Sequence, residues 1–112
     1  SLFQASLQAI QDRGTDGLAI IGVNSDGYDT AGAEFQSLYL TSVLKNMANA
    51  TRDAVLQIAN DGFDNTVYDG TLANDGVGIA PFHDFESSIT PELKADLDAL
   101  KQKIVDGTVS VR

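Results

Sequence analysis

Two polar side chains, Asn24 and Asp26, directly follow a run of apolar residues, and they are the side chains best placed for ligand chemistry. Residues 18–23 contain no polar side chain, which is typical of a strand buried on both faces of a parallel sheet. Ligands of open α/β sheets bind outside the carboxyl ends of such strands. A short carboxylate there can accept hydrogen bonds from two neighbouring hydroxyls, as on a sugar ring. The alternative is that Asn24, Asp26 and Gly27 form only a turn with local hydrogen bonds.

Lys45 is a second candidate ligand-binding residue. Aromatic and β-branched residues at 35–41 predict a strand, and the helical spacing that follows predicts a helix capped by Ser42. Lys45 would then lie in the first turn of that helix, where the partial positive charge disfavours a cation. Residues that break a local rule tend to cluster at functional sites, and this junction would open beside Asn24 and Asp26. The alternative is an exposed lysine that costs a few tenths of a kcal/mol.

The rest of the chain alternates helix and strand signals. The predicted elements are a helix from residue 1 or earlier to 13, a strand at 18–23, a strand at 35–41, a helix at 43–61, a hairpin of strands 66–72 and 77–80, a helix at 91–106 and a short strand at 109–111. Thr90 is the expected cap of the last long helix, with Pro91 at its first position. These elements predict an α/β fold with a parallel sheet flanked by helices, followed by a C-terminal hairpin and helix.

Composition excludes several classes of protein. The 112 residues suit one domain with a modest core, and no apolar run approaches the roughly 20 residues of a membrane-spanning helix. Sixteen acidic residues against seven basic ones give a net charge of −9, which repels nucleic acid, so we expect no nucleic-acid partner. The absence of cysteine excludes disulfides, zinc–thiolate sites and cysteine nucleophiles.

No pattern in the sequence demands catalysis. The dinucleotide fingerprint, the phosphate-binding loop, the nucleophile elbow and the calcium loop are all absent. His83 is the only histidine, and we expect a loop residue hydrogen-bonded to Asp84 or to the backbone rather than a metal ligand or a triad member. The sequence therefore predicts a protein that is not an enzyme, with no catalytic residue, no metal and no cofactor.

Several blocks, taken in order, resemble the basic membrane lipoprotein family, the substrate-binding lipoproteins of ABC transporters of the purine nucleoside receptor A type. Residues 21–26 resemble the family block IGVDSDQ, residues 40–46 resemble LTSMVKR, and residues 76–85 resemble GVGLAPFHDF. The closing segment 91–107 also matches, and residues 3–5 resemble part of VFQAA, which follows a Gly-rich turn in the family. The resemblance covers essentially the whole chain.

The resemblance implies a type 1 periplasmic-binding-protein fold, in which two α/β lobes close on a ligand. Two lobes of about 100–150 residues do not fit in this length, so we expect a single fragment, residues 1–112, from the carboxyl-terminal part of a two-lobe protein. The implied function is non-catalytic nucleoside binding for a bacterial ABC importer. The implied partners are a nucleoside and an ABC permease, and the implied location is the extracytoplasmic face of the cell membrane, with a lipid anchor, or the periplasm. An incomplete sheet with an exposed edge also predicts that the fragment self-associates.

The resemblance also assigns roles to three residues. Asp26 matches the aspartate that holds the 2′ and 3′ hydroxyls of ribose, Lys45 matches a lysine that reaches the ligand, and Asn24 supports the loop. The chain departs from the family where Asn24 replaces an aspartate and Gly27 replaces a glutamine, which leaves the identity of the ligand open. Two alternatives are a sensory or regulatory protein of the same fold, and an enzyme that uses Asp26 and Lys45 as acid and base.

Overall fold

The computed structural model describes residues 2–111, and their side chains from residue 4 onward, so the predicted beginning of the first helix at Ser1 lies outside the described residues. The elements in chain order are α1 (Leu2–Arg13), β1 (Ile20–Asn24), α2 (Gly27–Thr30), the 3-10 helix η1 (Ala33–Leu38), β2 (Tyr39–Lys45), α3 (Met47–Asp61), β3 (Val77–Ile79), the 3-10 helix η2 (His83–Ser88) and α4 (Pro91–Val105). The mixed α/β class predicted from the sequence is confirmed.

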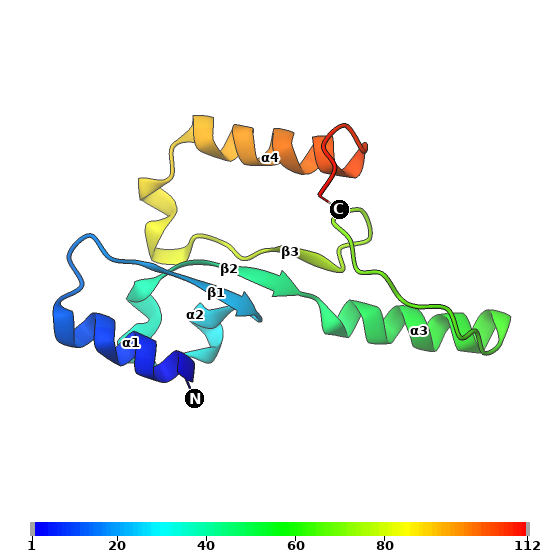
Figure 1. Cartoon of the computed structure of the whole chain (residues 1–112), viewed down its shortest axis with the longest axis horizontal. Helices are drawn as coiled ribbons and strands as arrows, with labels where there is room; N and C mark the ends of the chain where they lie inside the picture. The colour runs from blue at the N-terminus through cyan, green and yellow to red at the C-terminus, as the bar shows by residue number, and fades with distance from the viewer. Residues whose placement is uncertain (1, 112) are drawn as a thin grey trace.

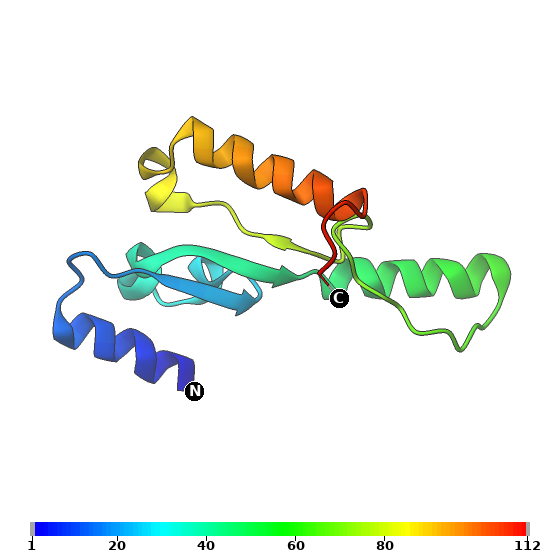
Figure 2. The same cartoon turned by 45° about the horizontal axis from the view of Figure 1, so that its top comes forward.

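The three strands form one mixed sheet in the order β1-β2-β3. β1 and β2 are parallel, whereas β3 is antiparallel to β2. In Figure 1 α1 and α2 lie on one side of the sheet and α4 lies on the other. In both views α3 extends beyond the carboxyl end of β2 (Figures 1 and 2). The chain therefore has an elongated shape, with extents of 53 × 34 × 23 Å.

The core lies between the sheet and the elements on the α1 side. Leu7, Leu38 and Tyr39 are buried together there, and Tyr39 is only 1% exposed. Further apolar residues pack around these three, namely Ile10, Ile20, Tyr28, Ala31 and Phe35. Two glycines allow this close packing, because a Cβ atom on Gly22 would overlap Ser42 and one on Gly27 would overlap the ring of Tyr39.

The opposite face of the sheet is apolar and exposed. The strand register places Val23, Val43 and Ile79 in one row, because Val43 pairs with Val23 on one side and with Ile79 on the other. These three residues are 60%, 46% and 52% exposed. The prediction that the first strand is buried on both faces is therefore wrong, because β1 is an edge strand and α4 does not cover its outer face.

The chain is less compact than a closed domain of its length. Its radius of gyration is 17.3 Å, whereas about 13 Å is expected for a compact domain of this size. Between α4 and the exposed sheet face runs a groove of about 740 Å³, whose lining includes Val43, Ile79, Ile104 and Val111. Large apolar side chains thus remain in contact with solvent on this face, although apolar sheet faces are usually buried in a protein core.

The strand predicted at 35–41 and the helix predicted at 43–61, which correspond to β2 and α3, both begin later in the structure. β2 runs from Tyr39 to Lys45, so Ser42 is a buried strand residue and does not cap a helix. α3 begins at Met47, with Asn46 as its N-cap residue. The helical spacing was misleading here because β2 is the central strand, and pairing on both sides outweighs local helix propensity.

The predicted hairpin and the predicted final strand are also wrong. Residues 66–72 form no strand, and residues 109–111 form none either. The predicted return strand does exist as β3, but it pairs with β2 instead of with the segment that precedes it. The turn at 74–76 therefore joins β3 to an irregular segment, and within residues 2–111 the antiparallel pairing of the sheet is limited to β2 and β3.

The close approach of Gly27 to Tyr39 gives a test of this packing. Gly27→Ala should destabilise the chain by about 2 kcal/mol, because the added methyl group overlaps a buried ring that has little room to move. Gly78→Ala is the matched control, since its Cβ atom would meet no atom within 4 Å. Urea denaturation followed by circular dichroism measures both variants, and equal stability of the two would contradict the packing described here.

Candidate functional site

Asp26 lies in a turn that folds back under the sheet directly after β1. Asn24 ends the strand with a left-handed backbone angle, φ = 81°, which reverses the direction of the chain. The backbone N–H of Gly27 then donates to Oγ of the buried Ser42 at 2.9 Å, which fixes the turn against β2. Asp26 is the N-cap residue of α2, and its Oδ1 accepts a hydrogen bond from the backbone N–H of Tyr28 at 3.1 Å.

His83 approaches Asp26 from a segment 57 positions further along the chain. Its Nε2 lies 2.8 Å from Oδ2 of Asp26, and its ring stacks on Tyr28 with 4.0 Å between centroids and 8° between planes. An ionised carboxylate only accepts hydrogen bonds, so the His83 tautomer that carries a proton on Nε2 satisfies this contact. The prediction that His83 bonds to Asp84 or to the backbone is wrong, because the strand order carries it to Asp26.

Hydrogen bonds to β2 hold the segment that precedes His83 in place. The backbone N–H of Ala80 donates to the carbonyl of Ser42 at 2.8 Å. The hydroxyl of Thr41 donates to the carbonyl of Ala80 at 2.7 Å. Ser42 therefore contacts both the turn that carries Asp26 and the strand end that leads to His83, and the two segments meet on either side of one buried residue.

Asp84 completes the group, and Asp26, Tyr28, His83 and Asp84 are called the Asp26 cluster below. The Tyr28 hydroxyl donates to Oδ1 of Asp84 at 3.1 Å. This hydrogen bond raises the pKa of Tyr28 above its ordinary value, with smaller contributions from burial and from the negative charges of Asp84 and Asp29. The side chains of Asp26 and His83 are 16% and 18% exposed, whereas Asp84 is exposed, so the cluster is partly buried on the Asp26 side and open to solvent on the Asp84 side.

Lys45 lies at the end of β2 and not in a helix, contrary to its predicted position. It lines a hollow of about 260 Å³ together with seven other residues, namely Asn46, Met47, Ala50, Tyr68, Gly70, Gly76 and Val77. Neither Asn24 nor Asp26 lines this hollow. The structure thus brings Asp26 together with His83, whereas Lys45 faces a separate depression.

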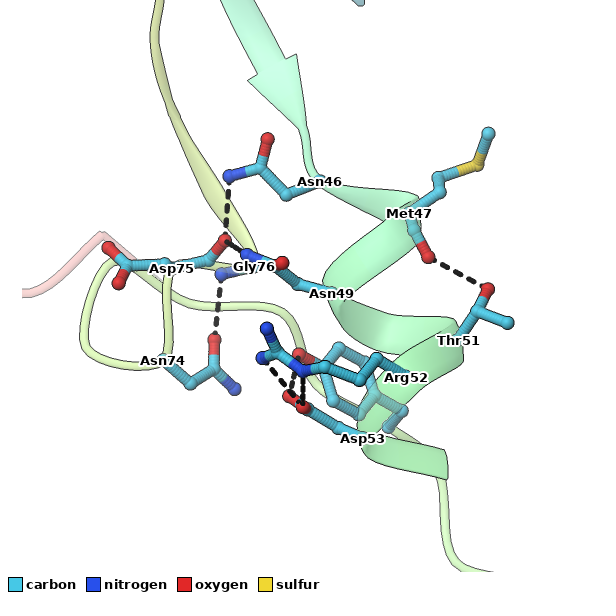
Figure 3. A network of polar contacts seen from close by, with 10 residues as sticks. Asn46, Met47, Asn49, Thr51, Arg52, Asp53, Asn74, Asp75 and Gly76 are labelled. Carbon is cyan, nitrogen blue, oxygen red and sulfur yellow. Dashed lines mark hydrogen bonds and ion pairs between the residues drawn. The ribbon is translucent and has the colours of Figure 1, made fainter. Parts of the chain in front are cut away.

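A network of polar contacts joins the start of α3 to the turn before β3 (Figure 3). Its residues Asn46 and Gly76 line the same hollow as Lys45. The side-chain amides of Asn46 and Asn49 donate to the carbonyl of Asp75 at 2.6 Å and 3.2 Å. The side chain of Asn74 accepts from the backbone N–H of Gly76 at 3.0 Å. These contacts fix the wall of the hollow near Lys45, and they join only residues of this chain.

Asn24, the third predicted binding residue, lies at the end of β1. It pairs in register with Leu44, the residue before Lys45, so Asn24 and Lys45 lie at the same end of the two parallel strands, as predicted. Its side chain is exposed there. Asp26 is separated from this end because the chain turns back immediately after Asn24.

The Asp26 cluster offers a carboxylate acceptor beside an aromatic ring and an imidazole. The two oxygens of Asp26 each accept one hydrogen bond in the structure, so each retains one further lone pair for a ligand hydroxyl. Within residues 2–111 no three potential metal-ligand side chains gather at one point. Across the same residues, every helix is too short or too polar to span a bilayer.

Comparison with models of known protein families gives no match, and comparison with curated proteins gives none either. The resemblance to the basic membrane lipoprotein family therefore depends on the ordered sequence blocks alone.

Tyr28 and His83 were not among the predicted site residues. A signal for His83 was present, because the only histidine of the chain falls inside the block at 76–85 that resembles the family. Tyr28 stands two positions after Asp26, where its backbone N–H is available to the side chain of a capping residue. The stacking of the two rings depends on strand pairing, so no pattern in the sequence around either residue could predict it.

The contact between Tyr28 and Asp84 predicts a change in alkaline titration. Asp84→Asn should lower the pKa of Tyr28 toward its ordinary value of 10.0, because the neutral amide removes the charge that opposes ionisation. Folding raises this pKa, so the contribution of Tyr28 to stability is present below pH 10 and is lost as the pH rises through the raised value. Ultraviolet absorbance of the tyrosinate form follows the titration.

Two further variants make this titration specific. Tyr28→Phe identifies the Tyr28 component among the three tyrosines, and Asp16→Asn removes an exposed charge from the turn after α1. An unchanged titration in Asp84→Asn would show that the negative charge of Asp84 does not raise the pKa of Tyr28 in solution.

Proposed function

We propose that this chain belongs to a non-catalytic substrate-binding protein, which binds a nucleoside through its ribose as the extracytoplasmic component of a bacterial ABC importer. Support comes from the ordered sequence blocks and from the environment of Asp26. The mixed α/β architecture, with a parallel pair of strands followed by polar residues, is compatible with one lobe of such a protein.

The observation that carries the proposal is the fixed carboxylate of Asp26. Its two oxygens are held by the N–H of Tyr28 and by His83, and one lone pair on each remains. Two adjacent acceptors on one carboxylate suit the two adjacent hydroxyls of a ribose ring, each donating one hydrogen bond. The partial enclosure of this carboxylate strengthens such charge-assisted bonds relative to a fully exposed site.

Lys45 and Asn24 have supporting roles in this proposal. Both lie at the carboxyl ends of the parallel strands, and Lys45 is exposed enough for its ammonium group to reach outward. A nucleoside that contacts both Asp26 and Lys45 must lie across the end of β1, because the turn at Asn24 separates the two side chains. Asn24 would then support that turn, and its amide would be available to the ligand.

The exposed apolar face supports the proposal that this chain is the carboxyl-terminal part of a larger protein. A row of three apolar side chains and a wide groove lie between the sheet and α4, where a closed domain would have its core. Among the described residues β1 pairs only with β2, so its other edge offers free backbone groups. Further chain would cover these surfaces in the intact protein, and self-association would cover them in the fragment.

The test is titration calorimetry of the intact protein with adenosine, guanosine, inosine, cytidine and uridine, with free ribose as a control. We expect at least one nucleoside to bind the intact protein and these 112 residues alone to bind weakly, because the proposal assigns the second wall of the cleft to another part of the protein. Absence of heat with every nucleoside, in a folded and ligand-free protein, would contradict the proposal and favour a sensory or regulatory protein with another ligand.

Substitution of Asp26 tests the residue assignment. Asp26→Asn should weaken nucleoside binding about tenfold or more, because it removes the negative charge from both ribose hydrogen bonds. Asparagine caps a helix as well as aspartate does, so stability should change little, whereas Asp26→Ala also removes the cap of α2 and should cost about 1 kcal/mol. Asp16→Asn, an exposed charge outside the cluster, is the control, and unchanged affinity in Asp26→Asn would exclude this residue as the ribose ligand.

A further inference from the structure

His83 has an unusual backbone conformation for a residue other than glycine. Its φ angle is 44°, in the left-handed region, at the start of η2. Such a conformation is unfavourable for most side chains and persists where the surrounding contacts impose it. The contacts that impose it here come from the adjacent strand end, because Ala80 is bonded to β2 through its N–H and its carbonyl.

The imidazole of His83 is held in one orientation by two different contacts. Its face lies parallel to the ring of Tyr28 at 4.0 Å, and its edge directs Nε2 at Oδ2 of Asp26. Tyr28 is itself held from the far side by the hydrogen bond to Asp84. The position of the imidazole is therefore set by residues of α2 and η2 together, and movement of either segment would break both contacts.

These contacts have a direct consequence for Asp26. The N–H of Tyr28 holds only Oδ1, and a carboxylate held at one oxygen can still pivot about that hydrogen bond by changing its χ1 and χ2 angles together. The second contact, from His83 to Oδ2, fixes both angles and defines where both remaining lone pairs point. A binding group fixed before the ligand arrives loses less conformational entropy on binding.

We propose that His83 is a positioning residue, which fixes the Asp26 carboxylate for a ligand with two adjacent hydroxyls, and that Tyr28 and Asp84 hold its ring in place. The part of this inference that concerns the ligand rests on the proposed function. The part that concerns the orientation of Asp26 stands on the contacts alone, and the two parts are measured separately.

The first measurement needs no ligand. In the 112-residue chain, the NMR couplings between Hα and the two Hβ protons of Asp26 report whether its side chain occupies one rotamer. We expect one rotamer in the unmodified chain and rotamer averaging in His83→Leu, which fills similar space without a donor. His83→Gln is the rescue variant, because its amide Nε2 can replace the lost donor, and it should restore the single rotamer. Ser87→Leu, an exposed residue of η2, is the control.

The second measurement is the affinity of the intact protein for the nucleosides named above. His83→Leu should weaken binding about tenfold, whereas His83→Gln should stay within about threefold of the unmodified protein. A merely structural role would not give this rescue, because glutamine neither stacks like imidazole nor favours the left-handed backbone. Equal affinity loss in both variants would overturn the positioning role.

The outcomes separate the two proposals. Averaging in His83→Leu with rescue by His83→Gln, in a protein that binds no nucleoside, supports the positioning role and contradicts the proposed function. A single Asp26 rotamer in folded His83→Leu overturns the positioning role even if nucleosides bind. If His83→Leu does not fold, Asp26→Ala tests the same contact from the other side. In Asp26→Ala, the NMR signals of the His83 ring should shift relative to the unmodified chain. These signals are unambiguous because the chain has one histidine, and unchanged signals would overturn the inference.

Discussion

The contact between the turn at 24–27 and the start of β2 is the constraint on which the site depends. Gly27 lies against the ring of Tyr39, and its N–H donates to the hydroxyl of Ser42, so the chain must fold back directly after β1. Both partners on β2 are buried, and the ring of Tyr39 leaves no room for a larger residue at position 27. Because this contact fixes α2, it also fixes the capping side chain at the start of α2, Asp26. The carbonyl of the same Ser42 accepts a hydrogen bond from Ala80, at the end of the strand that leads to His83. Ser42 therefore brings the segments that carry Asp26 and His83 close together.

Features encoded by short-range chemistry were predicted well from the sequence. The last helix begins where Thr90 caps it and Pro91 takes its first position, and the hydroxyl of Thr90 accepts from the N–H of Leu93 as expected of a cap. The polar residues after β1 and the end of α3 at Gly62 follow the same logic, because turn and cap preferences depend on few neighbours.

Features that depend on long-range pairing were predicted poorly. Val43 and Leu44 fit a helical stripe and a strand equally well, and only the partners on both sides of β2 decide for the strand. The same pairing draws β3 away from the preceding segment and so removes the predicted hairpin. For the site, the sequence indicated Asp26 as a hydroxyl acceptor but not His83 as its partner, because 57 residues separate them and their contact depends on the strand order.

The Asp26 carboxylate combines a structural role with the chemistry of a binding group. A carboxylate has about four acceptor positions, and the cap of α2 together with the imidazole uses two of them. Structural use of a binding residue normally restricts its function, since a fully satisfied group gains nothing from a ligand. Here the two structural contacts fall on different oxygens, so they fix the orientation of the group and leave one acceptor on each oxygen. A ligand with a single hydroxyl would use only half of this arrangement, whereas a vicinal diol would use all of it, which is why we propose a sugar ring as the ligand rather than a simple alcohol.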